Sequence, residues 1–121
     1  MNNKRVQRIS EEIRKVVSDL IFNRLNDPRI NSMTSVTRVE VTRDLSFAYI
    51  YISVLGDEKE KEDSLLGLNS AKGFIRKEIG SRVEMRHIPE PIFRLDESIE
   101  QAILMTKLIE EVNKPKDEKD E

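Results

Sequence analysis

Alternation of apolar and polar positions divides the chain into helical and extended segments. Apolar residues recur every three or four positions from Val6 to Ile21, which is the spacing of one stripe along a helix. We predict this helix over 5–25, because a residue that precedes a proline is driven out of the helical region and Pro28 follows. Residues 26–34 are predicted to form a loop.

Two strands follow the loop. Residues 35–42 are rich in β-branched side chains, and along residues 47–54 the side chains alternate between two faces of a strand. Because only a short polar link joins the two strands, we predict an antiparallel hairpin. Tyr49 and Tyr51 face away from the aliphatic residues of their strand. We expect helices to cover the aliphatic face and leave the tyrosines on the open side of the sheet. There they either cover the sheet or stack on nucleic-acid bases.

Helical spacing returns from Leu65 to Ile79, but Gly73 interrupts it and Ser70 has the character of a new N-cap. We predict two helices, over 58–69 and 71–81, that meet at a kink. One continuous helix that tolerates Gly73 is the alternative.

The last part of the domain is predicted to be a short strand and a helix. The strand should begin after Pro91, which has no N–H to donate, and should cover Ile92–Leu95. The helix is predicted from Asp96 to Asn113, with acids in its first turn and a stripe facing the core. Residues 114–121 carry no apolar side chain and are predicted to be a disordered tail.

The predicted fold class is therefore α+β, in the order α-β-β-α(kink)α-β-α. Residues 1–113 form one domain, in which helices cover one face of a three-stranded sheet.

Composition narrows the chemistry available to a chain of 121 residues. It has no cysteine and one histidine, His87, which excludes disulfide scaffolds and structural zinc and leaves little for nucleophilic catalysis. Glycine-rich phosphate-binding motifs are also absent from the sequence. We predict a protein that is not an enzyme and needs no cofactor. No apolar run suggests a signal peptide or a membrane span, so we expect no membrane partner and a cytoplasmic location.

Charge is distributed unevenly along the chain. The net charge of −2 argues mildly against a nucleic-acid partner. However, residues 1–25 and 67–95 each hold six Lys and Arg against three acids, whereas 57–63 and 96–121 are acidic. A partner experiences the local field, because salt screens more distant charges. The alternative is that each charged run, 57–63 above all, is a solvated helix face.

The kink is the best candidate for a binding site. It exposes the positive N-terminal end of the second helix, which suits a phosphate group. Lys72 and Arg76 lie one turn apart on that helix. Gly73 either lets a nucleic-acid backbone approach closely or serves helix packing. The residues predicted to bind RNA are Arg5, Arg8, Ser70, Ala71, Lys72, Gly73, Arg76, Lys77, Arg82 and Arg86.

Four blocks of sequence resemble the ribosome-binding factor A family, whose fold is a type II KH-like domain. They are the loop block 25–30 with its Asp27-Pro28-Arg29, the hairpin segments 36–45 and 48–54, the kink block 70–76 with its Ala71-Lys72-Gly73, and the block 86–90 with Phe93, Asp96 and Ser98. The chain departs from the family pattern at Asn31, in a stretch where a glycine is common, and at Pro91, where an aliphatic residue is common.

The resemblance implies a factor that binds the small (30S) ribosomal subunit and 16S rRNA during late maturation. It implies action near the 5′ end of the rRNA and the decoding region, a need in the cold, and departure before translation with the help of a ribosome-associated GTPase. We expect a monomer. The alternative is a protein-interaction module that binds a basic partner protein through the sheet face and the acidic last helix.

Overall fold

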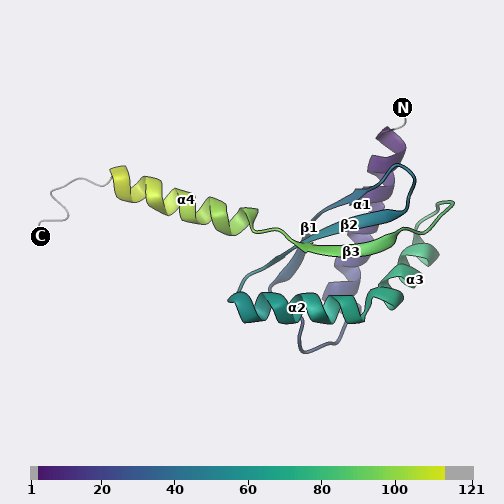
Figure 1. The fold of residues 1–121 in the computed structure, drawn as a ribbon, viewed down its shortest axis with the longest axis horizontal. Coiled ribbons are helices and arrows are strands. Elements are labelled where there is room, and N and C mark those ends of the chain that lie inside the picture. Colours follow the sequence, from purple (N-terminus) through teal and green to yellow (C-terminus); the bar gives the residue numbers. More distant parts are fainter. Residues whose placement is uncertain (1–2, 114–121) are drawn as a thin grey trace, which may run out of the picture.

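A computed structural model describes residues 3–113 of the chain (Figure 1). Its elements are α1 (Asn3–Asp19), the π-helical turn η1 (Leu20–Arg24), β1 (Thr34–Val41), β2 (Phe47–Val54), α2 (Glu58–Ser70), α3 (Lys72–Arg82), β3 (Glu90–Leu95) and α4 (Ser98–Asn113). The predicted α+β class and order of elements are confirmed. The predicted disordered tail, 114–121, lies outside the described residues.

The first helix and its π-helical end run without a break from residue 3 to 24. Ile9, Ile13 and Leu20 are fully buried, so the apolar stripe faces the core as predicted. The Leu25 N–H donates to the Leu20 carbonyl at 2.7 Å, which closes the wider final turn before the loop.

The sheet has the strand order β1-β2-β3. β1 and β2 form the predicted antiparallel hairpin, and β3 adds to the other edge of β2 in parallel. Along β2 the even-numbered residues are buried beneath the helices, whereas Tyr49 and Tyr51 are half-buried on the opposite face. The expected placement of the two tyrosines is confirmed.

The prediction that β3 begins after Pro91 is wrong. Pro91 is buried within the strand and lies opposite Ala48 of β2. The neighbouring Glu90 N–H donates to the Ser46 carbonyl at 2.9 Å, so alternate residues of β3 bond to β2. The nitrogen of Pro91 therefore points to the free edge of the sheet, where no donor is needed.

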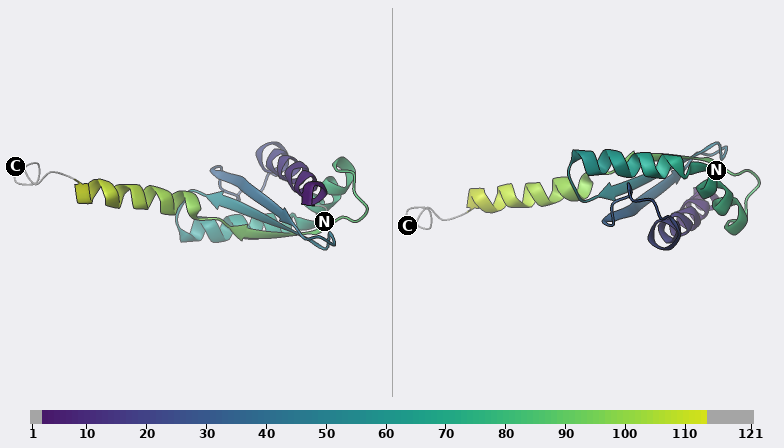
Figure 2. Two further views of the ribbon diagram at one scale, coloured as in Figure 1. Left: turned by 90° about the horizontal axis from the view of Figure 1, so that it is seen from above. Right: turned by 90° about the horizontal axis from the view of Figure 1, so that it is seen from below.

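The prediction that α4 packs its stripe on the core is also wrong, and the helix begins at Ser98 instead of Asp96. Figures 1 and 2 show α4 extending away from the sheet, with only its start near α2. Its apolar side chains are between 43% and 83% exposed: Ile99, Ile103, Leu104, Met105, Leu108, Ile109 and Val112. No helix within residues 3–113 is long and apolar enough to cross a membrane.

Hydrogen bonds at the start of α4 explain this direction. The Asp96 N–H donates to the Ile52 carbonyl at 2.7 Å, which extends the pairing with β2 one residue past the end of β3. The Asp96 carboxylate accepts the Thr37 hydroxyl at 2.7 Å and the Ser98 N–H at 3.0 Å. The chain thus enters α4 while still held along the strand, and the helix continues past the end of the sheet.

Lys61 fastens the first turn of α4 to α2. Its ammonium group lies 2.8 Å from the Glu97 carboxylate and 2.9 Å from that of Glu100, and its side chain is 5% exposed. The hydrogen bond to Glu97 and then that to Glu100 raise the pKa of Lys61. The expectation of a solvated run over 57–63 is therefore wrong at Lys61.

Candidate nucleic-acid interface

The chain bends at Ala71, between α2 and α3. The Ala71 N–H donates to the carbonyls of Gly67 and Leu68 at 3.2 and 3.1 Å, and its carbonyl accepts the Ile75 N–H at 2.9 Å. Two helices are therefore confirmed, and the continuous helix is wrong. The first N–H groups of α3 have no carbonyl partner within their own helix, and they carry the positive end of its dipole.

Gly73 lies in the first turn of α3 and is exposed to solvent. A Cβ atom added there would meet nothing within 4 Å, so the packing interpretation of Gly73 is wrong. Gly67 is the glycine that permits close packing, since a Cβ there would come within 2.7 Å of Ile30 Cγ1. The glycine at the bend thus offers bare backbone to solvent.

Three cations surround Gly73, and together we call these four residues the kink cluster: Lys72, Gly73, Arg76 and Lys77. The Lys72 ammonium is 3.2 Å from the Glu90 carboxylate. Arg76 Nη2 donates to the Ile88 carbonyl at 3.0 Å. Lys77 is exposed and forms no ion pair within residues 3–113.

The other two predicted basic residues of this region differ in setting. Arg82 is clamped by Asp19 at 2.7 Å and by Glu78 at 3.0 Å, and these carboxylates raise the pKa of Arg82. Arg86 is exposed in the segment between α3 and β3, the segment whose Ile88 carbonyl receives Arg76. Arg86 thus lies two residues before the carbonyl that binds Arg76, whereas Arg82 joins α3 to the end of α1.

Arg5 and Arg8 are not brought to the kink. Both are exposed in the first half of α1, and Arg8 pairs with Glu12. Arg82 meets α1 at Asp19, fourteen residues beyond Arg5, or about 21 Å along a helix. Figure 1 likewise shows the start of α1 and the α2–α3 junction at opposite ends of the domain. The predicted RNA-binding set thus falls into two separate groups.

Arg29 is a contact of the kink that the sequence reasoning missed. Its guanidinium binds the Asp27 carboxylate at 2.6 Å and the Ser70 hydroxyl at 3.1 Å. Ser70 is thus held by the loop after α1, and it does not cap α3. The sequence signal for this contact is the family block 25–30, to which the sequence alone assigns no partner.

We expect acid to break this contact. The Arg29 side chain and its backbone N–H lower the pKa of Asp27 to about 2, from an ordinary value of 3.8. A lowered folded-state pKa gives stability that is complete above the unfolded-state value and is lost as the pH falls toward 2. The difference in urea-unfolding stability between wild type and Asp27→Asn should be constant at pH 5–7 and should shrink below pH 4.

The control for this measurement is Glu62→Gln, at an exposed residue of α2 that forms no ion pair in the described chain. Its stability relative to wild type should change little over the same range. A difference between wild type and Asp27→Asn that persists undiminished at pH 2 would contradict the role of the ionised carboxylate.

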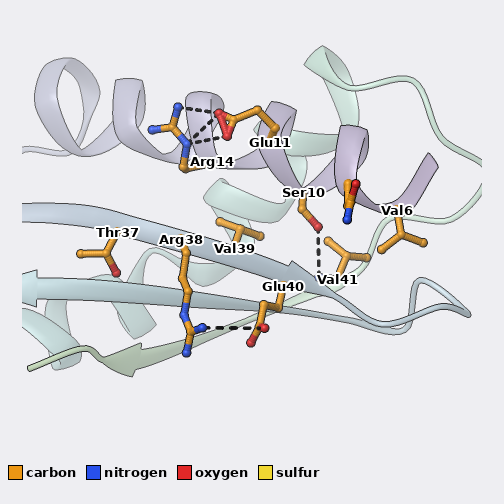
Figure 3. A pocket seen from close by; sticks show the side chains of 10 residues that line it. Val6, Ser10, Glu11, Arg14, Thr37, Arg38, Val39, Glu40 and Val41 are labelled. Atoms are coloured by element: carbon orange, nitrogen blue, oxygen red, sulfur yellow. Dashed lines mark hydrogen bonds and ion pairs between the residues drawn. The ribbon is translucent and has the colours of Figure 1, made fainter. Parts of the chain in front are cut away.

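Away from the kink, a groove lies between α1 and β1 (Figure 3), with a volume of about 460 Å³. Ser10 Oγ accepts the Val41 N–H at 3.2 Å and ties the strand to the helix. The charges of this groove are paired within each element: Glu11 with Arg14 and, at 3.9 Å, Glu40 with Arg38. The groove thus offers a weaker net field for a phosphate than the kink cluster does.

A three-stranded sheet, helices on one face and a basic bend between two helices define a type II KH-like domain. The crystal structure of ribosome-binding factor A from Thermus thermophilus has this fold, with a TM-score of 0.66 and 23% identity over 74% of this chain and 94% of that one. A Thermus thermophilus homology model fitted into a cryo-EM map of a 30S–RbfA complex gives a TM-score of 0.62 at 22% identity, over 76% of this chain and 96% of the other.

The family model for ribosome-binding factor A matches residues 5–109. The chain is 53% identical to ribosome-binding factor A of Finegoldia magna, over 93% of this chain and 94% of that protein. It is 55% identical to that of Alkaliphilus metalliredigens, over 95% of this chain and 84% of that protein. The chain belongs to the ribosome-binding factor A family, which confirms the family resemblance of its four sequence blocks.

Proposed function

We propose that this protein is a non-enzymatic assembly factor that binds the small ribosomal subunit and its 16S rRNA during late maturation. The observation that carries the proposal is the kink cluster, where three cations, of which Arg76 and Lys77 are exposed, flank bare backbone at the start of α3. The relatives named for ribosome binding, and the relative fitted into a 30S complex, support the same partner. The proposed place of action is near the 5′ end and the decoding region, with greatest need in the cold.

Cations and backbone N–H groups hold phosphates and fix the position of a protein on RNA, but they do not read bases. We therefore expect recognition of rRNA shape, with the helix bend seated on the sugar–phosphate backbone. A factor of this kind acts by occupying a surface and stabilising one arrangement of immature rRNA, so its effect depends on its preference between rRNA states. We further propose that the protein acts as a cytoplasmic monomer and that it leaves the subunit before translation, aided by a ribosome-associated GTPase.

Co-sedimentation with purified subunits tests the proposal. At equal salt, wild-type protein should pellet with immature small subunits at lower concentrations than it needs for mature ones. Equal retention on both, or retention on neither, would contradict an assembly role.

The alternative partner is a basic protein, and exposed α4 is the observation that favours it. The helix carries Glu100, Glu110 and Glu111 beside its uncovered apolar residues. Salt dependence on naked rRNA separates the two functions. If the protein binds phosphates, the slope of log affinity against log salt concentration should be roughly −0.7 for each charge neutralised on single strands. If its partner is a basic protein, it should not bind naked rRNA.

A further inference from the structure

The uncovered face of the sheet carries an arrangement that the kink does not account for. We call it the tyrosine face: Arg38, Phe47, Tyr49, Tyr51 and Arg94. The three aromatic residues form one column along β2, and the arginines come from the strands on either side. Figure 3 shows Arg38 extending from β1 to the side of the sheet away from α1.

The strand register places Tyr51 directly between the two arginines, opposite Arg38 on β1 and Arg94 on β3. The Arg38 guanidinium carbon lies 4.1 Å from the centre of the Tyr51 ring, and that of Arg94 lies 4.4 Å from the centre of the Tyr49 ring. Tyr49 also stacks with Phe47, with ring centres 6.3 Å apart. Flat cationic and aromatic groups therefore lie side by side over much of the face.

The arginines of this face are only weakly engaged by carboxylates. The nearest approach to Arg38 is 3.9 Å, from Glu40, and Arg94 forms no ion pair within residues 3–113. Phe47 is 38% exposed although it is a large apolar side chain. Side chains that only shielded the sheet from water would need neither the two guanidinium groups nor an exposed Phe47 ring.

We propose that the tyrosine face binds unpaired RNA, with bases stacking on the tyrosine rings and on the guanidinium planes. Unpaired bases stack on aromatic side chains and on arginine in this way, and a stacking sheet holds two or three of them. The arginines can turn from their own tyrosines toward phosphates as a base arrives. An aromatic surface flanked by cations fits an anionic chain of flat rings better than it fits an apolar protein surface.

The tyrosine face is continuous with the kink cluster. Lys72 of the cluster contacts Glu90, and Glu90 lies opposite Phe47 at the start of the aromatic column. One RNA strand can thus hold its phosphates at the kink and present its next bases to the sheet. This inference rests on the proposed function, because it gives the assembly factor a second contact on the same RNA.

Intrinsic fluorescence tests the inference without a substitution, since the chain has no tryptophan and its two tyrosines are Tyr49 and Tyr51. A single-stranded oligouridylate of about eight nucleotides, within the usual range of site sizes, should quench the tyrosine emission. A blunt RNA duplex of equal length should not. Free tyrosinamide with the same RNA corrects for light absorbed by the bases. Equal quenching by both RNAs, or by neither, would overturn the inference.

Substitutions give a second readout. Tyr49→Leu with Tyr51→Leu keeps the sheet covered but removes the rings, and should weaken oligouridylate binding at least tenfold, as followed by anisotropy of labelled RNA. Tyr49→Phe with Tyr51→Phe keeps the rings and should bind within twofold of wild type. Circular dichroism verifies that both variants fold.

The outcomes distinguish this inference from the proposed function. If the leucine variant binds immature subunits and oligouridylate as wild type does, stacking is refuted and the kink proposal is untouched. If it loses subunits but keeps oligouridylate, the face contacts a ribosomal protein and the inference is wrong. If wild type binds no subunit but its tyrosines are quenched by single strands alone, the proposed function fails and base stacking stands.

Discussion

Replacing Lys72, Arg76 and Lys77 together by glutamine should weaken binding to immature small subunits about 100-fold or more. Each replacement removes a charge-assisted hydrogen bond to a phosphate, and such bonds contribute about 1.5–3 kcal/mol apiece. The slope of log affinity against log salt concentration should also become less steep by roughly 2 units, since three fewer charges are neutralised. Filter binding at several salt concentrations measures both effects.

Glutamine is preferable to glutamate here, because Lys72→Glu would place a second carboxylate beside Glu90, 3.2 Å from the present ammonium group. The matched variant is Glu90→Gln, which releases Lys72 and should tighten RNA binding several-fold. Unchanged affinity and unchanged slope in the triple variant, with a wild-type circular dichroism spectrum, would show that the kink cluster does not bind phosphate.

Gly73→Leu should weaken binding at least tenfold while the protein stays as stable as wild type. The position is open, so the side chain fits in the free protein, and replacing glycine in a helix favours folding by up to about 1 kcal/mol. In the complex the same side chain would occupy the place of the RNA backbone. Thermal unfolding and subunit binding of the one variant measure the two effects.

Gly67→Ala is the matched control and should behave in the opposite way. Its Cβ would press on Ile30 Cγ1 at 2.7 Å, and overpacking of this kind costs about 1–3 kcal/mol. The control should therefore melt at a lower temperature and still bind subunits below that temperature. Wild-type binding by Gly73→Leu would mean that RNA does not approach the bend.

The sequence predicted features that depend on neighbours in the chain. Alternation along residues 47–54 predicts Tyr49 and Tyr51 on the open face, and Gly73, three residues after Ser70, favours the bend over a continuous helix. Pro91 was misjudged because its effect depends on whether its strand lies at an edge and on which way its nitrogen points. Neither the place of the strand in the sheet nor the direction of that nitrogen can be predicted from the neighbouring residues.

Contacts between distant segments account for the other differences. An apolar stripe predicted a buried α4, but the direction of that helix is set by Thr37 and Ile52, which bond Asp96 from β1 and β2. The local run of charges predicts a solvated Lys61, because its carboxylate partners are 36 and 39 residues away in the sequence. In the candidate site, the cations adjacent in sequence lie together at the kink, whereas Arg29 reaches Ser70 only through the fold.

The most direct test of RNA binding through the kink is chemical probing of 16S rRNA in immature small subunits, with and without the protein. Wild type should protect a discrete set of nucleotides near the 5′ end and the decoding region. The protein with glutamine at positions 72, 76 and 77 should leave that set as reactive as it is in free subunits. The same protections from both proteins, or no protection by wild type, would contradict binding of rRNA at the kink.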